Sequence, residues 1–134
     1  MIQGKVAVIE DTLLTRTVIL DRLKELECEA EGFASFEEFL ASPVMAMADL
    51  VLMDIELPGI SGLEALQRIR ARHEGLPVII ITGHGTVERA VEALKAGAFD
   101  FFTKPIDFTK LGVAIKNAMR QYRLVREISG MKRR

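Results

Sequence analysis

Short apolar runs that end at polar residues alternate with longer segments of helical periodicity along this 134-residue chain. Three of these runs, at 6–9, 50–53 and 78–81, contain only Ala, Val, Ile, Leu and Met. Uninterrupted apolar runs of this length are typical of parallel strands that are covered on both faces. We therefore expect an α/β fold with a doubly wound, five-stranded parallel sheet and five helices. The predicted strands are 5–9, 28–33, 50–54, 78–82 and 98–103.

The segments between the strands carry apolar residues at three- and four-residue spacing, which predicts helices. The second helix begins with a capping-box pattern, Ser35 and Glu38, and is interrupted at Pro43. In the first and fourth helices we expect the apolar stripe to face the sheet. These stripes are Leu13, Thr17, Leu20, Leu23 and Leu26, and Val87, Ala90, Val91 and Leu94. The predicted helices are 12–26, from 35 onward, 63–72, 86–95, and from Asp107 or Thr109 to about 128.

Polar side chains that can take part in binding or catalysis lie where four of the predicted strands end. Glu10 and Asp11 follow the first strand, Asp54 ends the third, Thr82 ends the fourth, and Lys104 follows the fifth. The carboxyl ends of parallel strands meet at one edge, where open α/β sheets bind their ligands. Taken singly, each of these motifs also has a purely structural explanation. Glu10-Asp11 could be the start of a helix, and Thr82 could be an ordinary residue at the end of a strand. Asp54 is more informative, because buried carboxylates are rare unless they are paired.

Three carboxylates at one edge of a sheet repel one another, and a hard divalent cation relieves that repulsion. Asp11 and Asp54 suit direct ligation of Mg²⁺, whereas Glu10 is better placed to act through water. A metal and the Lys104 ammonium would form a positive pocket beside Asp54. Such a pocket suits phosphoryl transfer, with the Asp54 carboxylate as nucleophile and the Thr82 hydroxyl as a donor to a phosphoryl oxygen.

In their order and spacing these residues resemble the receiver domain of bacterial two-component response regulators. The resemblance covers roughly residues 3–125 and implies a flavodoxin-like sheet of strand order 2-1-3-4-5. The matching motifs are Glu10-Asp11 after an apolar strand, Met53-Asp54 followed by Leu57-Pro58-Gly59-Ile60-Ser61-Gly62, Thr82-Gly83, Ala96-Gly97-Ala98, and Phe101 three residues before Lys104-Pro105. We also predict that the bond between Lys104 and Pro105 is cis, since X-Pro is the common place for cis peptides.

The resemblance implies a role for each matched residue. Asp54 is the phosphate acceptor. Asp11, Asp54 and the backbone carbonyl of Glu56 hold Mg²⁺, and Glu10 assists through water. Lys104 contacts the phosphoryl group.

Four further positions follow from the same resemblance. Thr82, which also contacts the phosphoryl group, forms the switch pair with Phe101. Glu56 and His84, each two residues beyond a site residue, tune the lifetime of the phosphoryl group. The implied donor is a phosphohistidine on a sensor histidine kinase or phosphotransfer protein.

The expected function is a phosphorylation-activated signalling switch in a phosphorelay, connected with transcription regulation, and not a turnover enzyme. One alternative is a Mg²⁺-dependent phosphatase of the haloacid-dehalogenase type, which also forms an aspartyl phosphate. Those enzymes normally carry a second Asp two residues after the nucleophile, where this chain has Glu56. A second alternative is a receiver-like interaction module that is never phosphorylated.

Composition excludes several other classes of protein. The formal net charge of -1 provides no general attraction to DNA or anionic membranes, so we do not expect direct nucleic-acid binding. No apolar run approaches the roughly 20 residues of a membrane span. The one cysteine, Cys28, cannot form an intrachain disulfide, which suits a reducing compartment. We expect a cytoplasmic protein.

The last predicted helix extends beyond what a compact domain would bury. Leu111, Ile115, Ala118, Tyr122 and Val125 recur at four- and three-residue spacing, as in a coiled coil. We expect residues 1–125 to form the receiver domain, with 126–134 as a helix end and basic tail that is a candidate linker to an output domain. The last helix and last strand are the expected surface for a homodimer.

Overall fold

Five parallel strands form one sheet in the order β2-β1-β3-β4-β5, as predicted. The structure is a computed structural model that describes residues 4–73 and 75–133. The order reverses direction between β1 and β3, which places a topological switch point at the carboxyl ends of these two strands. The strands are β1 (Lys5–Ile9), β2 (Glu29–Phe33), β3 (Leu50–Asp54), β4 (Val78–Thr82) and β5 (Asp100–Thr103).

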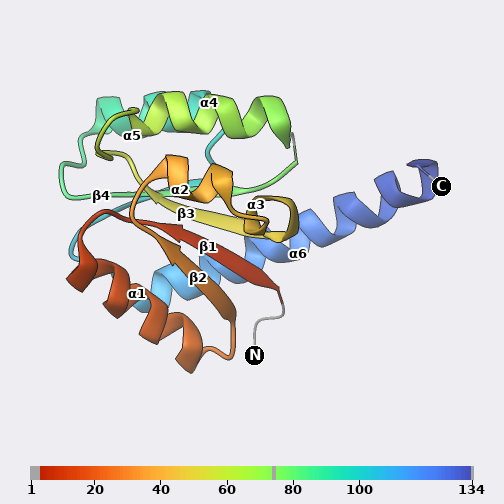
Figure 1. The fold of residues 1–134 in the computed structure, drawn as a ribbon, viewed down its shortest axis with the longest axis horizontal. Helices are drawn as coiled ribbons and strands as arrows, with labels where there is room; N and C mark the ends of the chain where they lie inside the picture. The colour runs from red at the N-terminus through yellow and green to blue at the C-terminus, as the bar shows by residue number, and fades with distance from the viewer. Residues whose placement is uncertain (1–3, 74, 134) are drawn as a thin grey trace.

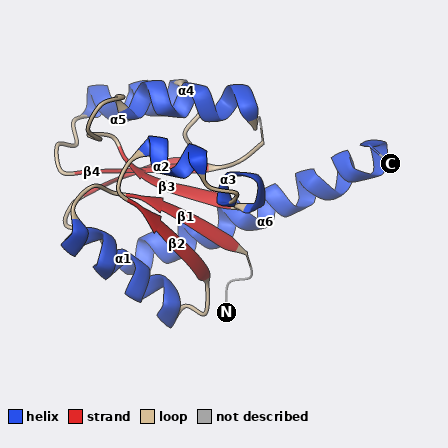
Figure 2. Cartoon of the chain, in the orientation of Figure 1, coloured by secondary structure: helices blue, strands red, loops and turns tan. Residues whose placement is uncertain are grey.

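Helices connect the strands, and all five predicted helices are present (Figure 2). A four-residue helix is added after Pro43, where the sequence predicted only an interruption. The last helix runs to Arg133, beyond its predicted end near 128. The helices are α1 (Leu13–Glu25), α2 (Phe36–Ala41), α3 (Val44–Met47), α4 (Gly62–Arg72), α5 (Val87–Lys95) and α6 (Phe108–Arg133). None of the described helices has the length and apolar character needed for a bilayer span.

The sheet is covered on both faces, with α1 and α6 on one side and α2, α4 and α5 on the other (Figure 1). Alternate strand residues enter different cores, because successive side chains point to opposite faces. Val6 and Val8 pack with α1 and α6, whereas Ala7 and Ile9 pack with α2 and α4. Every residue of β3 and β4 is buried, which explains their uninterrupted apolar sequences.

Side chains at the helix starts satisfy backbone donors that have no partner within the helix. Ser35, Ser61 and Thr86 each accept a hydrogen bond from the backbone N–H three residues further on. The capping interaction predicted at Ser35 is thereby confirmed. Asp107 acts similarly before α6, since its carboxylate accepts from the backbone N–H groups of Thr109 and Lys110.

The predicted inner face of α5 is wrong. Val87, Val91 and Leu94 are 79%, 43% and 48% exposed, and the buried residue of this helix is Ala93. A small residue against the sheet allows the helix to approach closely, and the larger apolar residues then lie outside. The prediction failed because periodicity locates an apolar stripe but does not say which way the stripe faces.

The first helix shows the same error in part. Leu13 and Leu26 are exposed, whereas Ile19 and Leu23 make its buried face. The helix therefore contacts the sheet mainly through its middle turns.

The C-terminal half of α6 is anchored before it leaves the domain body (Figure 1). Tyr122 is buried, and its hydroxyl lies 3.1 Å from Nε2 of His73 at the end of α4. Arg126 donates to Asp49 at 2.7 Å. Leu124 and Val125, between these two contacts, are exposed, and beyond Arg126 the helix continues away from the sheet.

Candidate functional site

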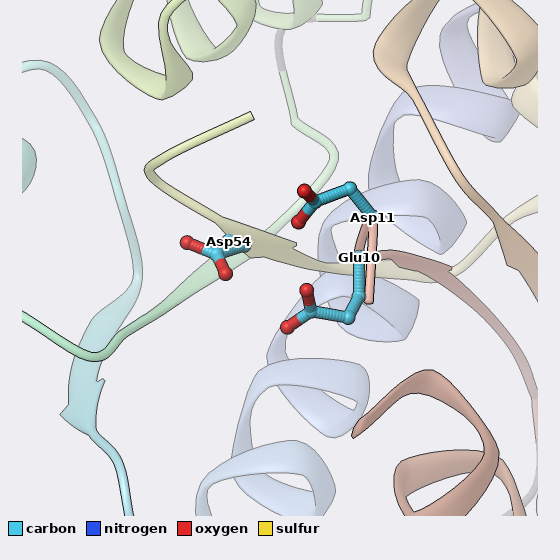
Figure 3. Close-up of side chains that lie close together, drawn as sticks. All are labelled: Glu10, Asp11 and Asp54. Carbon is cyan, nitrogen blue, oxygen red and sulfur yellow. The ribbon is translucent and has the colours of Figure 1, made fainter. Parts of the chain in front are cut away.

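The carboxylates of Glu10, Asp11 and Asp54 converge at the carboxyl edge of the sheet (Figure 3). One oxygen of each lies within 4.8 Å of the others. Strand pairing produces this arrangement, because Ile9 is in register with Met53 on the neighbouring strand. Glu10 and Asp54 are 2% and 6% exposed, whereas Asp11 is open to solvent. The cluster is therefore reached from the side of Asp11.

Lys104 lies between the two buried carboxylates. Its Nζ donates to Oε1 of Glu10 at 2.7 Å and to Oδ2 of Asp54 at 2.9 Å. The bond from Lys104 to Pro105 is cis, as predicted. One cation thus neutralises part of the negative charge that β1 and β3 bring together.

Glu10 and Lys104 both have a pKa above the ordinary value of their residue type. Burial raises the pKa of Glu10, and the hydrogen bonds from Lys104 and the Thr12 N–H only partly offset this. Burial alone would lower the pKa of Lys104, but its hydrogen bonds to Glu10 and Asp54 outweigh burial and raise it. Lys104 is therefore held firmly in its charged form, and the Glu10 carboxyl beside it is a weaker acid than an exposed glutamate.

The loop after β3 holds Asp54 in place. Oδ1 of Asp54 accepts from the backbone N–H of Glu56 at 2.8 Å. Gly62 at the start of α4 packs on the backbone of Ile55, where an added Cβ would lie 2.4 Å from the Ile55 Cα. Only glycine permits that approach, so the turn that positions Asp54 depends on Gly62.

A second group of side chains adjoins the acidic cluster. The buried Thr82 hydroxyl donates to Oε1 of Glu56 at 3.3 Å and accepts from the His84 backbone N–H at 3.1 Å. The same Glu56 oxygen lies 2.5 Å from Nδ1 of His84 and 3.8 Å from Nη1 of Arg89. The hydrogen bond with His84 lowers the pKa of Glu56, and Arg89 and Thr82 act in the same direction.

Phe101 lies on β5, opposite Ile80 of β4. Its ring is half-buried and packs against the core on the α2, α4 and α5 side of the sheet. Gly85 brings the loop between β4 and α5 against this strand, since an added Cβ would lie 1.9 Å from Cγ2 of Thr103. The loop that carries His84 and the strand that carries Phe101 are therefore in direct contact.

Comparison with known proteins identifies the family. Residues 6–116 match the model of the response regulator receiver domain. This chain belongs to that family.

Relatives of the receiver include several longer regulators. This chain is 35% identical over 122 residues to the DNA-binding transcriptional regulator NtrC of Salmonella typhimurium, and the match covers 91% of this chain and 26% of NtrC. It is 41% identical to the response regulator protein PilR of Pseudomonas aeruginosa over 77% of this chain and 22% of PilR. The transcriptional regulatory protein FixJ of Bradyrhizobium diazoefficiens is 34% identical over 89% of this chain and 58% of FixJ. The receiver thus spans about a quarter of NtrC and PilR.

Solved structures show the same architecture. A response regulator receiver domain from Clostridium thermocellum superposes with a TM-score of 0.84 at 31% identity, covering 91% of this chain and 98% of that one. NtrX from Brucella abortus, solved in complex with ADP, gives 0.87 at 32% identity, over 98% of this chain and 30% of NtrX. The flavodoxin-like fold expected from the sequence is confirmed.

Apart from Phe101, which packs on β5, the expected site residues of the receiver form two adjoining groups. Glu10, Asp11, Asp54 and Lys104 form the first. Thr82, Glu56 and His84 form the second, in which Glu56 and His84 contact each other.

Sequence reasoning missed Arg89, which joins the second group from α5. The available signal was that Arg89 lies in the first turn of the helix that follows the Thr82 loop. The periodicity of α5 did not indicate a contact between Arg89 and Glu56.

Proposed function

We propose that this receiver is a phosphorylation-activated switch in which Asp54 accepts a phosphoryl group from a phosphohistidine. The observation that carries the proposal is the burial of Asp54 at the sheet edge, among two further carboxylates and beside Lys104. The donor would belong to a sensor histidine kinase or phosphotransfer protein. A partner protein or an output domain would convert the switch into a transcription-related response, since NtrC and FixJ are named as transcriptional regulators.

The acidic cluster fits Mg²⁺, because it supplies oxygen donors within a few ångströms and is open on the Asp11 side. Asp11, Asp54 and the backbone carbonyl of Glu56 would hold the ion, with Glu10 acting through water. The ion would neutralise charge on the phosphoryl oxygens. Lys104 provides a second positive charge at the same oxygens.

The chemical step is an in-line displacement. One carboxylate oxygen of Asp54 forms a bond to phosphorus as the P–N bond of the phosphohistidine breaks, and the electron pair leaves with the imidazole. Lys104 already contacts Asp54 and stays charged, so it can pair with a phosphoryl oxygen without first gaining a proton. The product is an acyl phosphate on Asp54.

The approach to Asp54 passes an apolar surface at the start of α1. Leu13 and Leu14, two and three residues after Asp11, are 67% and 74% exposed, and Val18 continues this surface one turn later. A donor protein that covers these side chains would bring its histidine to the open side of the site. This surface supports a protein as the phosphoryl donor.

Phosphorylation would be transmitted through Thr82 and Phe101. An added phosphoryl group brings about −1.5 to −2 charge and strong acceptor oxygens, to which the Thr82 hydroxyl would turn. Phe101 is half-buried and would then pack further inward. Movement of β5 and α5 would change the surface that a partner recognises.

The same proposal assigns roles to the two parts of the chain. Residues 1–125 would form the receiver domain, and 126–134 would continue α6 into a linker to an output domain. Leu124 and Val125 are exposed near that point and are available to a second copy of the chain. A homodimer through α6 and β5 is the expected assembly.

Glu56 and His84 would tune the lifetime of the acyl phosphate, because both lie on the solvent side of the pocket. The phosphatase alternative is less well supported, since Glu56 stands where those enzymes carry a second Asp and is occupied with His84. We therefore propose a switch and not a turnover enzyme.

Mass spectrometry after incubation with Mg²⁺ and acetyl phosphate tests the proposal. We expect one phosphoryl group on the wild type and none on Asp54→Asn, with a beryllofluoride-induced spectral change as independent evidence. Steady release of phosphate from small esters would favour the phosphatase. No mass gain and no spectral change would favour an interaction module that is never phosphorylated.

A further inference from the structure

Glu56 joins three segments of the receiver that are separate in the sequence. It lies in the loop after β3, and its Oε1 contacts Thr82 at the end of β4, His84 in the following loop and Arg89 on α5. The distances to these partners are 3.3, 2.5 and 3.8 Å. A single carboxylate oxygen therefore ties the switch threonine to the helix that follows it.

The Thr82 hydroxyl has one proton to donate. In this structure the proton goes to Glu56, and the hydroxyl accepts from the His84 backbone N–H. Thr82 is fully buried, so water does not offer an alternative acceptor. A phosphoryl oxygen on Asp54 would have to compete with Glu56 for that one proton.

We propose that Glu56 is a positioning residue that holds Thr82 away from Asp54 in the unphosphorylated receiver and couples this position to α5 through His84 and Arg89. Phosphorylation then takes the Thr82 proton from Glu56. The new negative charge also repels the Glu56 carboxylate. Both effects release the contacts to His84 and Arg89, so that α5 is freed from the loop after β3.

This inference rests on the proposed function but extends it. It assigns Glu56 a part in the conformational equilibrium, in addition to any effect on the lifetime of the phosphoryl group. It also predicts that removing Glu56 activates the receiver without phosphorylation. A residue that acted only on hydrolysis would leave the unphosphorylated conformation unchanged.

Amide NMR of the ¹⁵N-labelled chain measures this equilibrium directly. Spectra of the wild type, first free and then with Mg²⁺ and beryllofluoride, give two positions for each amide peak of Gly83 and α5. The line between these two positions follows the conformational equilibrium. We expect free Glu56→Ala to move along that line toward the beryllofluoride-bound position, with about a tenfold rise in the bound-like population. Glu92→Gln, a matched charge change at an exposed position of α5, should stay at the wild-type position.

Arg89→Ala separates this coupling from a simple charge effect. Loss of a cation would by itself weaken binding of the beryllofluoride anion and leave the free spectrum in place. Release of α5 predicts instead that free Arg89→Ala moves in the same direction as Glu56→Ala, by a smaller fraction. His84→Ala should behave like Arg89→Ala.

Two negative outcomes have different meanings. If the wild type responds to beryllofluoride but Glu56→Ala shifts only amides around residue 56, away from the line, the coupling inference is overturned and the switch proposal stands. If the wild type shows no response to beryllofluoride at all, both are overturned. Dispersed amide spectra of each variant establish that it is folded.

Discussion

The two halves of the site differ in how they are built. The buried half consists of Glu10 and Asp54 with the half-buried Lys104, which lie at strand ends and are held by the register of the sheet. Glu56, His84 and Arg89 are 42%, 76% and 42% exposed and reach one another from two loops and a helix. We expect the buried half to contribute strongly to the stability of the fold and to have little freedom to move. The exposed half should contribute little to stability, which suits a group that must rearrange when Asp54 is modified.

Removing Lys104 should produce the largest change in stability. Lys104→Ala leaves Glu10 and Asp54 close together without their common cation, and we expect a loss of about 3 kcal/mol in the free energy of unfolding without Mg²⁺. Urea unfolding measures this, and Lys110→Ala, at an exposed position of α6, is the control. A loss below about 1 kcal/mol would mean that the buried half is no more firmly held than a surface ion pair.

Gly62→Ala tests whether the turn behind Asp54 is rigid. The added Cβ would meet the backbone of Ile55 at 2.4 Å, so we expect a destabilisation of about 2 kcal/mol, typical of overpacking. Gly112→Ala is the matched control, because its Cβ would make an ordinary contact of 3.6 Å with Leu26. Alanine there should stabilise α6 by about 0.5–1 kcal/mol. Equal effects at both positions would contradict the close approach at Ile55.

Glu56→Gln should have little effect on stability. Its ion pairs are exposed and screened by solvent, so we expect the urea midpoint of unfolding to stay close to that of the wild type. The same variant should nevertheless alter the NMR spectrum of the unphosphorylated receiver. A loss comparable with that of Lys104→Ala would show that the exposed half is structural, and the contrast between the halves would fail.

Cys28 provides a test of burial elsewhere in the fold, with an effect confined to high pH. Burial raises the pKa of this thiol from 9.0 to about 11, and Asp49 and Glu29 add to the rise. The unfolded thiol therefore ionises first as the pH increases, and its contribution to stability, complete below pH 9, is lost between pH 9 and about 11. The urea midpoint of the wild type should fall more than that of Cys28→Ala over this range. If the urea midpoints of the wild type and Cys28→Ala changed equally with pH, the raised pKa of Cys28 would be contradicted.

Much of the buried half could be predicted from the sequence. Apolar runs ending at Asp54 and Thr82 placed these residues at one sheet edge, because parallel strands leave few alternatives. The helix cap at Ser35 could also be predicted, because it depends only on nearby residues. It is confirmed by the hydrogen bond that the Glu38 backbone N–H donates to the Ser35 hydroxyl.

The exposed half could not be predicted in the same way. The contact between Glu56 and His84 joins two loops, and the ion pair with Arg89 depends on how α5 is rotated about its axis. Periodicity turned α5 the wrong way, since it placed Val87 and Leu94 against the sheet. Rotation of a helix is decided by packing against a small residue such as Ala93, a tertiary effect that local patterns do not contain.

The anchored end of α6 acts as a lever. Tyr122 fixes the helix against His73, and the helix continues from there to Arg133 without a break. Arg126 adds a second contact, to Asp49, so the free arm begins after it. At about 1.5 Å per residue this arm is about 10 Å long, and a tilt of about 10° at the anchor would displace its tip by about 2 Å. Small rearrangements inside the receiver are thus enlarged at the end of α6.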